Sequence, residues 1–578
     1  MRHALSLLAP LFAAAAFGGI ATAQDPGGAA EGGDAAARRS PNNPLVSLRE
    51  LQQRRRPQPG PDRGAATFPR ELRSIDGSHN NSANPTWGSV GVPFLRRVAA
   101  DYSDGASAPA AADQASARVI SNRVAAQTES VANQAGVSDF LWQWGQFLDH
   151  DLDLTPETEP AEAFDIAVPS GDGWFDPEGT GERAIHLLRS LYEDVDGVRQ
   201  QVNAITAFID GSNVYGSDRE RADALRAFDG EGNLATSDGD LLPFNDAGLP
   251  NAAIGDPASF FLAGDFRANE QVGLTAMHTL FVREHNFWAE RVRRAFPEMD
   301  GEGVYQYAKA IVTAELQAIT YNEFLPVLLG PGALPRYEGY RRRVNAGISN
   351  VFATAAYRFG HSMLSPRLLR LDAEGDEIAA GHLSLAEAFF NPEALQDFGL
   401  EPILRGLATQ RAQEIDNLVV DEVRNFLFGP PGAGGFDLAA LNIQRGRDHG
   451  LPGFNQIRRE LGLRPYRRFS QIHPDPEVAA RLRSAYATVE DIDAWVGGLA
   501  EAHAEGALVG PTWKAVLADQ FRRLRDGDRF WYQSYLPRFL VEMVEEQSLA
   551  RIIRRNTEIG AELSDNPFRV PRPPSDGV

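Results

Sequence analysis

The sequence contains no cysteine among its 578 residues, which excludes disulfide bonds and thiolate chemistry. Core packing, a metal or a cofactor must therefore stabilise the fold. After the N-terminus, no apolar run is long enough to suggest a membrane span. Positive charge is also in deficit. The formal net charge is -22, which argues against nucleic acid as a partner and against binding to anionic membranes.

Strand-like alternation is scarce as well, and the sequence shows no internal repeat. Apolar residues at helical spacing are present instead. In residues 275–296 they fall largely on one side, at Met277, Leu280, Phe281, Phe287 and Trp288. The same pattern continues from Val304 as far as Pro326, which is predicted to end it. The sequence thus predicts a mainly α protein, a single large helical domain with very little β structure.

The N-terminal segment differs in composition from the rest of the chain. Residues 1–23 have the basic, apolar and small-residue order of a signal peptide, so we expect an exported protein, secreted or periplasmic. Residues 24–70 are rich in Pro, Gly and Arg, which predicts a disordered linker. The folded domain is predicted to span residues 71–578.

A cluster of polar residues interrupts the apolar segment LWQWGQFLDHDLDLTP, Leu141 to Pro156. It contains Gln146, Asp149, His150 and Asp151. A solvated acidic turn would explain the cluster, and so would a pocket that needs a base, an anchor and a metal ligand side by side.

A second candidate histidine, His361, lies in FATAAYRFGHSMLSP. Arg358 precedes it by three residues, on the same helical face, and Pro366 is predicted to end the helix. A neutral imidazole here could bind a metal through one nitrogen while its other nitrogen needs a partner. A structural histidine is the alternative.

Oxygen donors alternate in QVNAITAFIDGSNVYGSD at Thr206, the Phe208 carbonyl, Asp210 and Ser212. Such a loop could surround a hard cation, since calcium accepts six to eight oxygens. An ordinary Asp-Gly turn is the alternative by pattern alone.

Two further segments carry candidate polar residues. In FLAGDFRANE, Arg267 and Glu270 are three apart and would share a helical face as an ion pair. An arginine can also stabilise negative charge that develops beside a bound oxygen species. In LAALNIQRGRDHG, Asn442 and Arg445 lie where turn and capping chemistry would also explain them.

Together, and in this order, these segments resemble the animal-type haem peroxidase family of the peroxidase-cyclooxygenase superfamily. The resemblance runs from Arg73 to the segment RFWYQSYLPRFL, and matches as long as WGQFLDHDLDLTP are highly specific. It implies a haem peroxidase domain with haem b and calcium. The expected reaction is reduction of hydrogen peroxide at the expense of halides, pseudohalides or small aromatic donors.

The resemblance also implies roles for the residues. On the distal side His150 resembles the acid-base histidine, Arg267 the catalytic arginine and Gln146 the glutamine that holds water or halide. Asp149 and Glu270 resemble the carboxylates that can form esters with haem. His361 resembles the proximal iron ligand and Asn442 the acceptor of its other N–H, while Arg445 is similar to the arginine near a haem propionate; Arg358 is grouped with these cofactor-binding residues. Asp151 would join Thr206, Phe208, Asp210 and Ser212 around calcium.

Departures from the family pattern refine the expectation. Gln271 stands where the family's strongest chloride oxidiser has a haem-linked methionine, so bromide, iodide, thiocyanate or phenols are the expected donors. The missing cysteines fit a bacterial exported member. The alternatives are a fatty-acid dioxygenase of the same superfamily, disfavoured because Arg358 replaces its radical tyrosine, and a non-catalytic calcium-binding or adhesion module. Oligomeric state is left open.

Overall fold

The computed structural model describes residues 68–253, 255–430 and 435–570, which all belong to one compact unit, Pro61–Val578. The predicted signal peptide, most of the predicted linker and residues 571–578 lie outside the described residues. None of the described helices is both long enough and apolar enough to cross a membrane.

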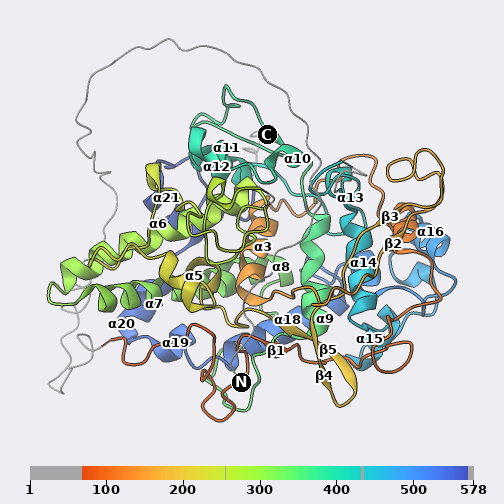
Figure 1. The fold of residues 1–578 in the computed structure, drawn as a ribbon, viewed down its shortest axis with the longest axis horizontal. Coiled ribbons are helices and arrows are strands. Elements are labelled where there is room, and N and C mark those ends of the chain that lie inside the picture. The colour runs from red at the N-terminus through yellow and green to blue at the C-terminus, as the bar shows by residue number, and fades with distance from the viewer. Residues whose placement is uncertain (1–67, 254, 431–434, 571–578) are drawn as a thin grey trace, which may run out of the picture. The chain divides into compact units, whose positions relative to one another are not determined.

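Helices dominate the described residues, as predicted (Figure 1). In chain order they are α2 (Ala117–Ile120), α3 (Phe140–Leu152), α4 (Ser212–Tyr215), α5 (Arg219–Ala224), α6 (Val272–Ala295), α7 (Gly301–Ile319), α8 (Leu325–Leu329), α9 (Asn350–Thr354), α10 (Leu385–Ala388), α11 (Glu393–Phe398), α12 (Glu401–Thr409), α13 (Asp421–Arg424), α14 (Leu438–Asp448), α15 (Phe454–Glu460), α16 (Pro476–Ala485), α17 (Ala494–Ala500), α18 (Pro511–Asp526), α19 (Tyr532–Tyr535), α20 (Arg538–Glu545) and α21 (Leu549–Asn556).

The strands are short and pair only antiparallel. They are β1 (Val92–Pro93), β2 (Ile166–Ala167), β3 (Ala184–Ile185), β4 (Tyr192–Val195), β5 (Val198–Asn203), β6 (Arg367–Leu368) and β7 (Leu383–Ser384). The largest sheet has the order β1-β5-β4, with Tyr192 opposite Gln201; β2 pairs with β3 and β6 with β7. These ribbons lie at the periphery of the helices and form no layer of their own (Figure 1).

Helix α3 forms the centre of the core. It is buried on nearly every side, which is typical of a helix that other helices surround. Trp144 and Phe147 pack on Phe281 of α6, with ring centroids 5.9 and 5.1 Å apart. Figure 1 shows α3 in the middle, with α6 on one side and α9 and α14 on the other. The candidate residues of α3 therefore face elements from distant parts of the sequence.

Two sequence expectations about helix ends need correction. The chain stays helical beyond Pro326, because a π-helical turn, Thr320–Phe324, leads into α8. Pro326 directly follows this π-helical turn, in which the Leu325 N–H donates to the Thr320 carbonyl, so the proline lies where the helical hydrogen-bond pattern changes. The helical segment around His361 ends at Ser362, before Pro366, and consists of α9 followed by a 3₁₀ turn, Ala356–Ser362.

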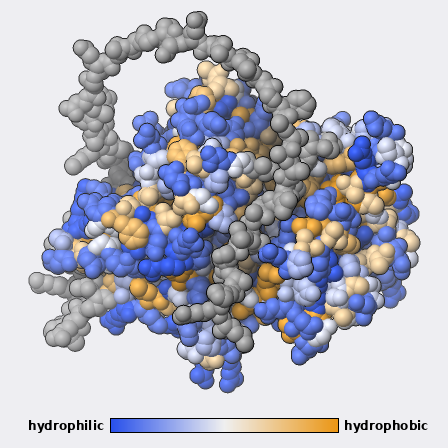
Figure 2. Space-filling view, viewed as in Figure 1, coloured by the Kyte–Doolittle hydropathy of each residue, from blue (hydrophilic) through white to orange (hydrophobic). Residues whose placement is uncertain are grey.

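The face drawn in Figure 2 is mainly hydrophilic, and its apolar residues are scattered rather than gathered in one patch. Among the described residues the most exposed large apolar side chain is Phe228, which keeps 64% of its surface accessible.

Candidate active site

His150 lies in the last turn of α3 and is buried, with only 3% of its surface exposed. Its Nδ1 has no hydrogen-bond partner among the described residues and lies 3.5 Å from Oδ1 of Asp265. Burial, and then the nearby charge of Arg267, hold the pKa of His150 well below its usual value. The imidazole is therefore neutral and can accept a proton.

Asp265 connects His150 to Arg267. Its two carboxylate oxygens accept hydrogen bonds from Nε and Nη2 of Arg267, each at 2.9 Å, and Oδ1 also accepts from the Arg267 backbone N–H. The charge of Arg267 lowers the pKa of Asp265 despite its burial. One ionised carboxylate thus fixes Arg267 and lies 3.5 Å from the ring of His150, although the sequence pattern did not single it out. The available signal was an aspartate two residues before Arg267.

The segment around Arg267 corrects the expectation of a shared helical face. Residues 264–271 form turns, and the Glu270 backbone N–H donates to the Arg267 carbonyl at 2.8 Å. Helix α6 begins only at Val272, because Gln271 is extended and caps it. Arg267 instead lies close to α3, with Nη1 3.5 Å from Oδ2 of Asp149.

Gln146 and Glu270 lie in direct contact with each other beside these residues. Nε2 of Gln146 donates to Oε2 of Glu270 at 3.0 Å. Burial raises the pKa of Glu270 to about 7, against the attraction of Arg267. Gln146, Asp149, His150, Arg267 and Glu270 therefore meet at one place, as the sequence predicted.

His361 lies on the 3₁₀ turn, beside helix α14. Its Nδ1 is 2.7 Å from Nδ2 of Asn442, which is fully buried. Oδ1 of Asn442 accepts from Nη1 of Arg358 at 3.2 Å. Burial and the charge of Arg358 lower the pKa of His361 to about 3, so the ring is neutral.

The expected polarity of the Asn442 contact stays a prediction, because the proton of a neutral imidazole can lie on either ring nitrogen. A histidine that binds iron through Nε2 carries its proton on Nδ1, and the oxygen of Asn442 would then accept it. The structure brings the two residues together, with 2.7 Å between the ring and the amide. Arg358 and His361 share a face because a 3₁₀ helix repeats every three residues.

The guanidinium of Arg445 is partly used by hydrogen bonds to residues that follow β3. Its Nη1 donates to the Leu188 carbonyl, to Oγ of Ser190 and to Oδ2 of Asp448. Nη2 and Nε make no hydrogen bond within the described residues, so they are the part of this side chain that an anionic group could use.

The candidate cation loop packs against the residue after His150. Ser212 donates from Oγ to Oδ1 of Asp151 at 2.8 Å, and the Gly211 backbone N–H donates to Oδ2. Thr206 donates from Oγ1 to Oδ1 of Asp210 at 3.1 Å, and Phe208 lies in the same loop. Burial and the charge of Asp210 raise the pKa of Asp151 to about 8. Two carboxylates therefore lie close together in a buried place, and a bound cation would stabilise this arrangement.

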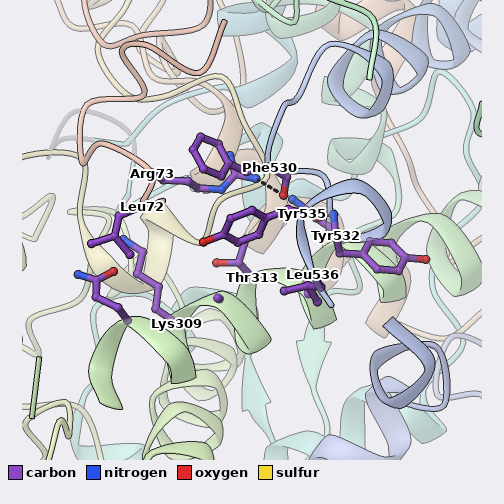
Figure 3. A pocket seen from close by; sticks show the side chains of 12 residues that line it. Leu72, Arg73, Lys309, Thr313, Phe530, Tyr532, Tyr535 and Leu536 are labelled. Atoms are coloured by element: carbon purple, nitrogen blue, oxygen red, sulfur yellow. Dashed lines mark hydrogen bonds between the residues drawn. The ribbon is translucent and has the colours of Figure 1, made fainter. Parts of the chain in front are cut away.

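A cavity of about 30 Å³ lies behind this loop, between α7 and residues 530–536 (Figure 3). Arg73 reaches over it to Asp528, 2.6 Å away, and to the Phe530 carbonyl. Thr313 donates to the Asp210 carbonyl at 3.0 Å. The residues around this cavity support the cation loop. They are separate from the residues that surround His150 and His361.

Comparison with known proteins decides the family. The family model described as animal haem peroxidase matches residues 72–568. The chain belongs to this family. Peroxinectin A of Dictyostelium discoideum is 38% identical over 516 residues, which cover 86% of this chain and 96% of that protein. Human eosinophil peroxidase is 37% identical over 545 residues, covering 85% and 75%.

A solved structure agrees with the family assignment. Peroxidase A from Dictyostelium discoideum superposes with a TM-score of 0.82 at 37% identity, covering 86% of this chain and 99% of that one. As a member of the animal haem peroxidases, the chain is an oxidoreductase that acts on hydrogen peroxide. The predicted fold class, a mainly α peroxidase domain, is confirmed.

The dioxygenase alternative receives less support than peroxidase activity. The fatty-acid α-dioxygenase of Oryza sativa superposes with a TM-score of 0.72 but is only 22% identical, so it shows the shared fold alone. Tyr357 packs among aromatic rings, stacked on Phe352 at 4.7 Å and beside Phe521 at 5.7 Å. Its side chain is buried in that cluster.

The residues present fit the haem that membership of the peroxidases implies. Two buried neutral histidines come from separate elements, and within the described residues Nε2 of neither ring makes a hydrogen bond. Gln146, Arg267 and Arg445 each keep an N–H group without a hydrogen bond in the same part of the chain. His361 would hold the iron, and Asp149 and Glu270 lie among the residues on the side of His150.

Proposed function

We propose that this peroxidase oxidises bromide, iodide, thiocyanate or small aromatic donors, with His150 as its acid-base residue. Haem, when bound, supplies the iron at which peroxide is reduced. The observation that carries the proposal is the arrangement of His150, Arg267 and Asp265, which places a neutral base and a fixed cation side by side.

The chain's own residues account for the proton movements. Because Nδ1 of His150 faces Asp265, Nε2 is the nitrogen free to accept a proton from hydrogen peroxide and to return it to the departing oxygen, which leaves as water. Arg267 cannot lose its proton beside Asp265, so it stabilises the negative charge that develops as the O–O bond breaks.

Haem binding and turnover test this proposal together. The chain would be produced with haem, its absorption spectrum recorded, and peroxide added with bromide or a phenol. We expect a Soret band and turnover in the wild type, and a fall of roughly 10²- to 10⁴-fold in kcat/KM for peroxide in His150→Ala, with the Soret band retained. A chain that binds no haem, or a variant with wild-type turnover, would refute the assignment and favour the non-catalytic scaffold.

We propose calcium as the cation of the Asp151 loop, with Thr206, Phe208, Asp210 and Ser212. Asp151 directly follows His150, so an ion there would hold the backbone of the base in place. Ester links from Asp149 and Glu270 to haem are part of the same proposal, as is export, which rests on the order of residues 1–23 alone.

A chelator and Asp151→Asn test the cation. Without calcium, the asparagine variant should melt at a higher temperature than the wild type, because it removes one of two neighbouring buried carboxylates. With calcium the order should reverse, because the variant has lost a ligand. Melting temperatures that do not respond to calcium in either protein would contradict the assignment.

A further inference from the structure

Four amide and carboxyl side chains form a directional chain of hydrogen bonds beside the distal pocket. Nε2 of Gln271 donates to Oε1 of Gln143 at 2.6 Å and to Oε1 of Gln146 at 3.1 Å. Nε2 of Gln146 then donates to Glu270. Gln271 is 3% exposed, so water does not replace these contacts.

A backbone group fixes the direction of this chain. The N–H of Gly273 donates to Oε1 of Gln271 at 2.7 Å, as part of the cap of α6. A backbone N–H can only donate, so the oxygen of Gln271 must point toward it and the NH₂ group must point the other way. Both hydrogens of that NH₂ group are used, one on Gln143 and one on Gln146.

Gly273 leaves the space in which the amides meet. A Cβ at this position would come within 2.5 Å of Oε1 of Gln143 and 2.9 Å of Oε1 of Gln271. The close approach of these side chains to α6 therefore depends on the absence of a side chain at residue 273.

The consequence falls on Gln146. Because Gln271 occupies its oxygen, Gln146 must turn its NH₂ group toward Glu270 and the pocket. One N–H goes to Glu270 and the second has no partner within the described residues. The reversed orientation would oppose the NH₂ groups of Gln146 and Gln271 and would leave a carbonyl facing Glu270.

We propose that Gln271 is a positioning residue that makes Gln146 a hydrogen-bond donor to a small anion, a halide or pseudohalide, in the distal pocket. The inference rests on the proposed function and deepens it, since it names the group that sets anion affinity. Gln271 itself touches neither the anion nor the haem in this role.

The test is bromide affinity, measured from the change that bromide causes in the absorption spectrum of the haem-loaded chain. In Gln271→Glu at a pH where the introduced carboxyl is ionised, residue 271 can only accept, so Gln146 turns and presents its carbonyl. We expect bromide to bind at least about tenfold more weakly, the loss of one hydrogen bond to a charged ligand. At lower pH the protonated carboxyl regains a donor and affinity should return.

Gln143→Glu is the matched control for added charge. It places a carboxylate in the same network, but residue 143 already accepts from Gln271, so the orientation of Gln146 is kept. We expect its affinity to stay within roughly threefold of the wild type, since only charge at a distance has changed. Gln271→Leu, which removes the donor without charge, should weaken bromide binding as well and guards against a variant that merely misfolds.

The outcomes separate the two proposals. Equal weakening in Gln271→Glu and Gln143→Glu, or wild-type affinity in Gln271→Leu, would overturn the role of Gln271 in a chain that is still a peroxidase. Absence of bromide binding in an active wild type would overturn it too. Absence of haem or of peroxide turnover in the wild type would instead refute the proposed function.

Discussion

The two sides of the active site hold a buried neutral histidine in opposite ways. His361 is bound at 2.7 Å by Asn442, whose oxygen is occupied by Arg358. Within the described residues His150 makes no hydrogen bond through Nδ1, which lies 3.5 Å from the carboxylate of Asp265. One ring is anchored by a neutral amide, and the other is left able to take up a proton.

This difference separates a ligand from a base. A ligand must keep its orientation and remain neutral, which burial and the adjacent Arg358 ensure. A base must gain charge during the reaction, which the ionised Asp265 makes less unfavourable. The surroundings of the two histidines thus fit the roles proposed for them, ligand for His361 and base for His150.

Among the substitutions that test this comparison, His361→Ala should have the largest effect. We expect loss of haem binding, seen as loss of the Soret band, because no other residue of the 3₁₀ turn offers a nitrogen ligand at that place. His150→Ala should keep its haem. Added imidazole should restore the band in His361→Ala, and haem binding that persists without imidazole would show that the proximal ligand is a different residue.

A smaller effect is expected from Asp265→Asn, which leaves the shape of the side chain but removes its charge. His150 and Arg267 would both lose their shared partner, so kcat/KM for peroxide should fall by roughly 10- to 100-fold, as for other groups that orient catalytic ligands. Haem content should not change. Asp256→Asn, at an exposed cap in the same stretch of chain, is the control and should behave as the wild type.

The sequence alone predicted the helical class, the candidate residues and the resemblance, because these depend on local pattern. It failed where the outcome depends on distant segments. Asp265 is an ordinary turn aspartate until α3 brings His150 beside it, and the contact of Asn442 with Arg358, 84 residues earlier, forms only in the folded chain. Arg267 and Glu270 were misplaced on a helix because the cap at Gln271 delays the start of α6.

The smallest expected effect concerns Glu270, a buried carboxyl on the side of His150. It sharpens the comparison because we assign no such carboxyl to the side of His361 among the described residues. The pKa of Glu270 is raised from 4.5 to about 7 in the folded chain. The folded protein then keeps a proton that the unfolded chain loses, so this stabilisation is complete below pH 4.5 and disappears as the pH rises through 7. In haem-free protein the melting temperature should therefore decrease as the pH is raised from 4.5 to 7. Glu270→Gln should make this decrease with pH less steep. An ester to haem would abolish the titration, so a slope that persists unchanged in fully loaded enzyme would show that Glu270 is not linked.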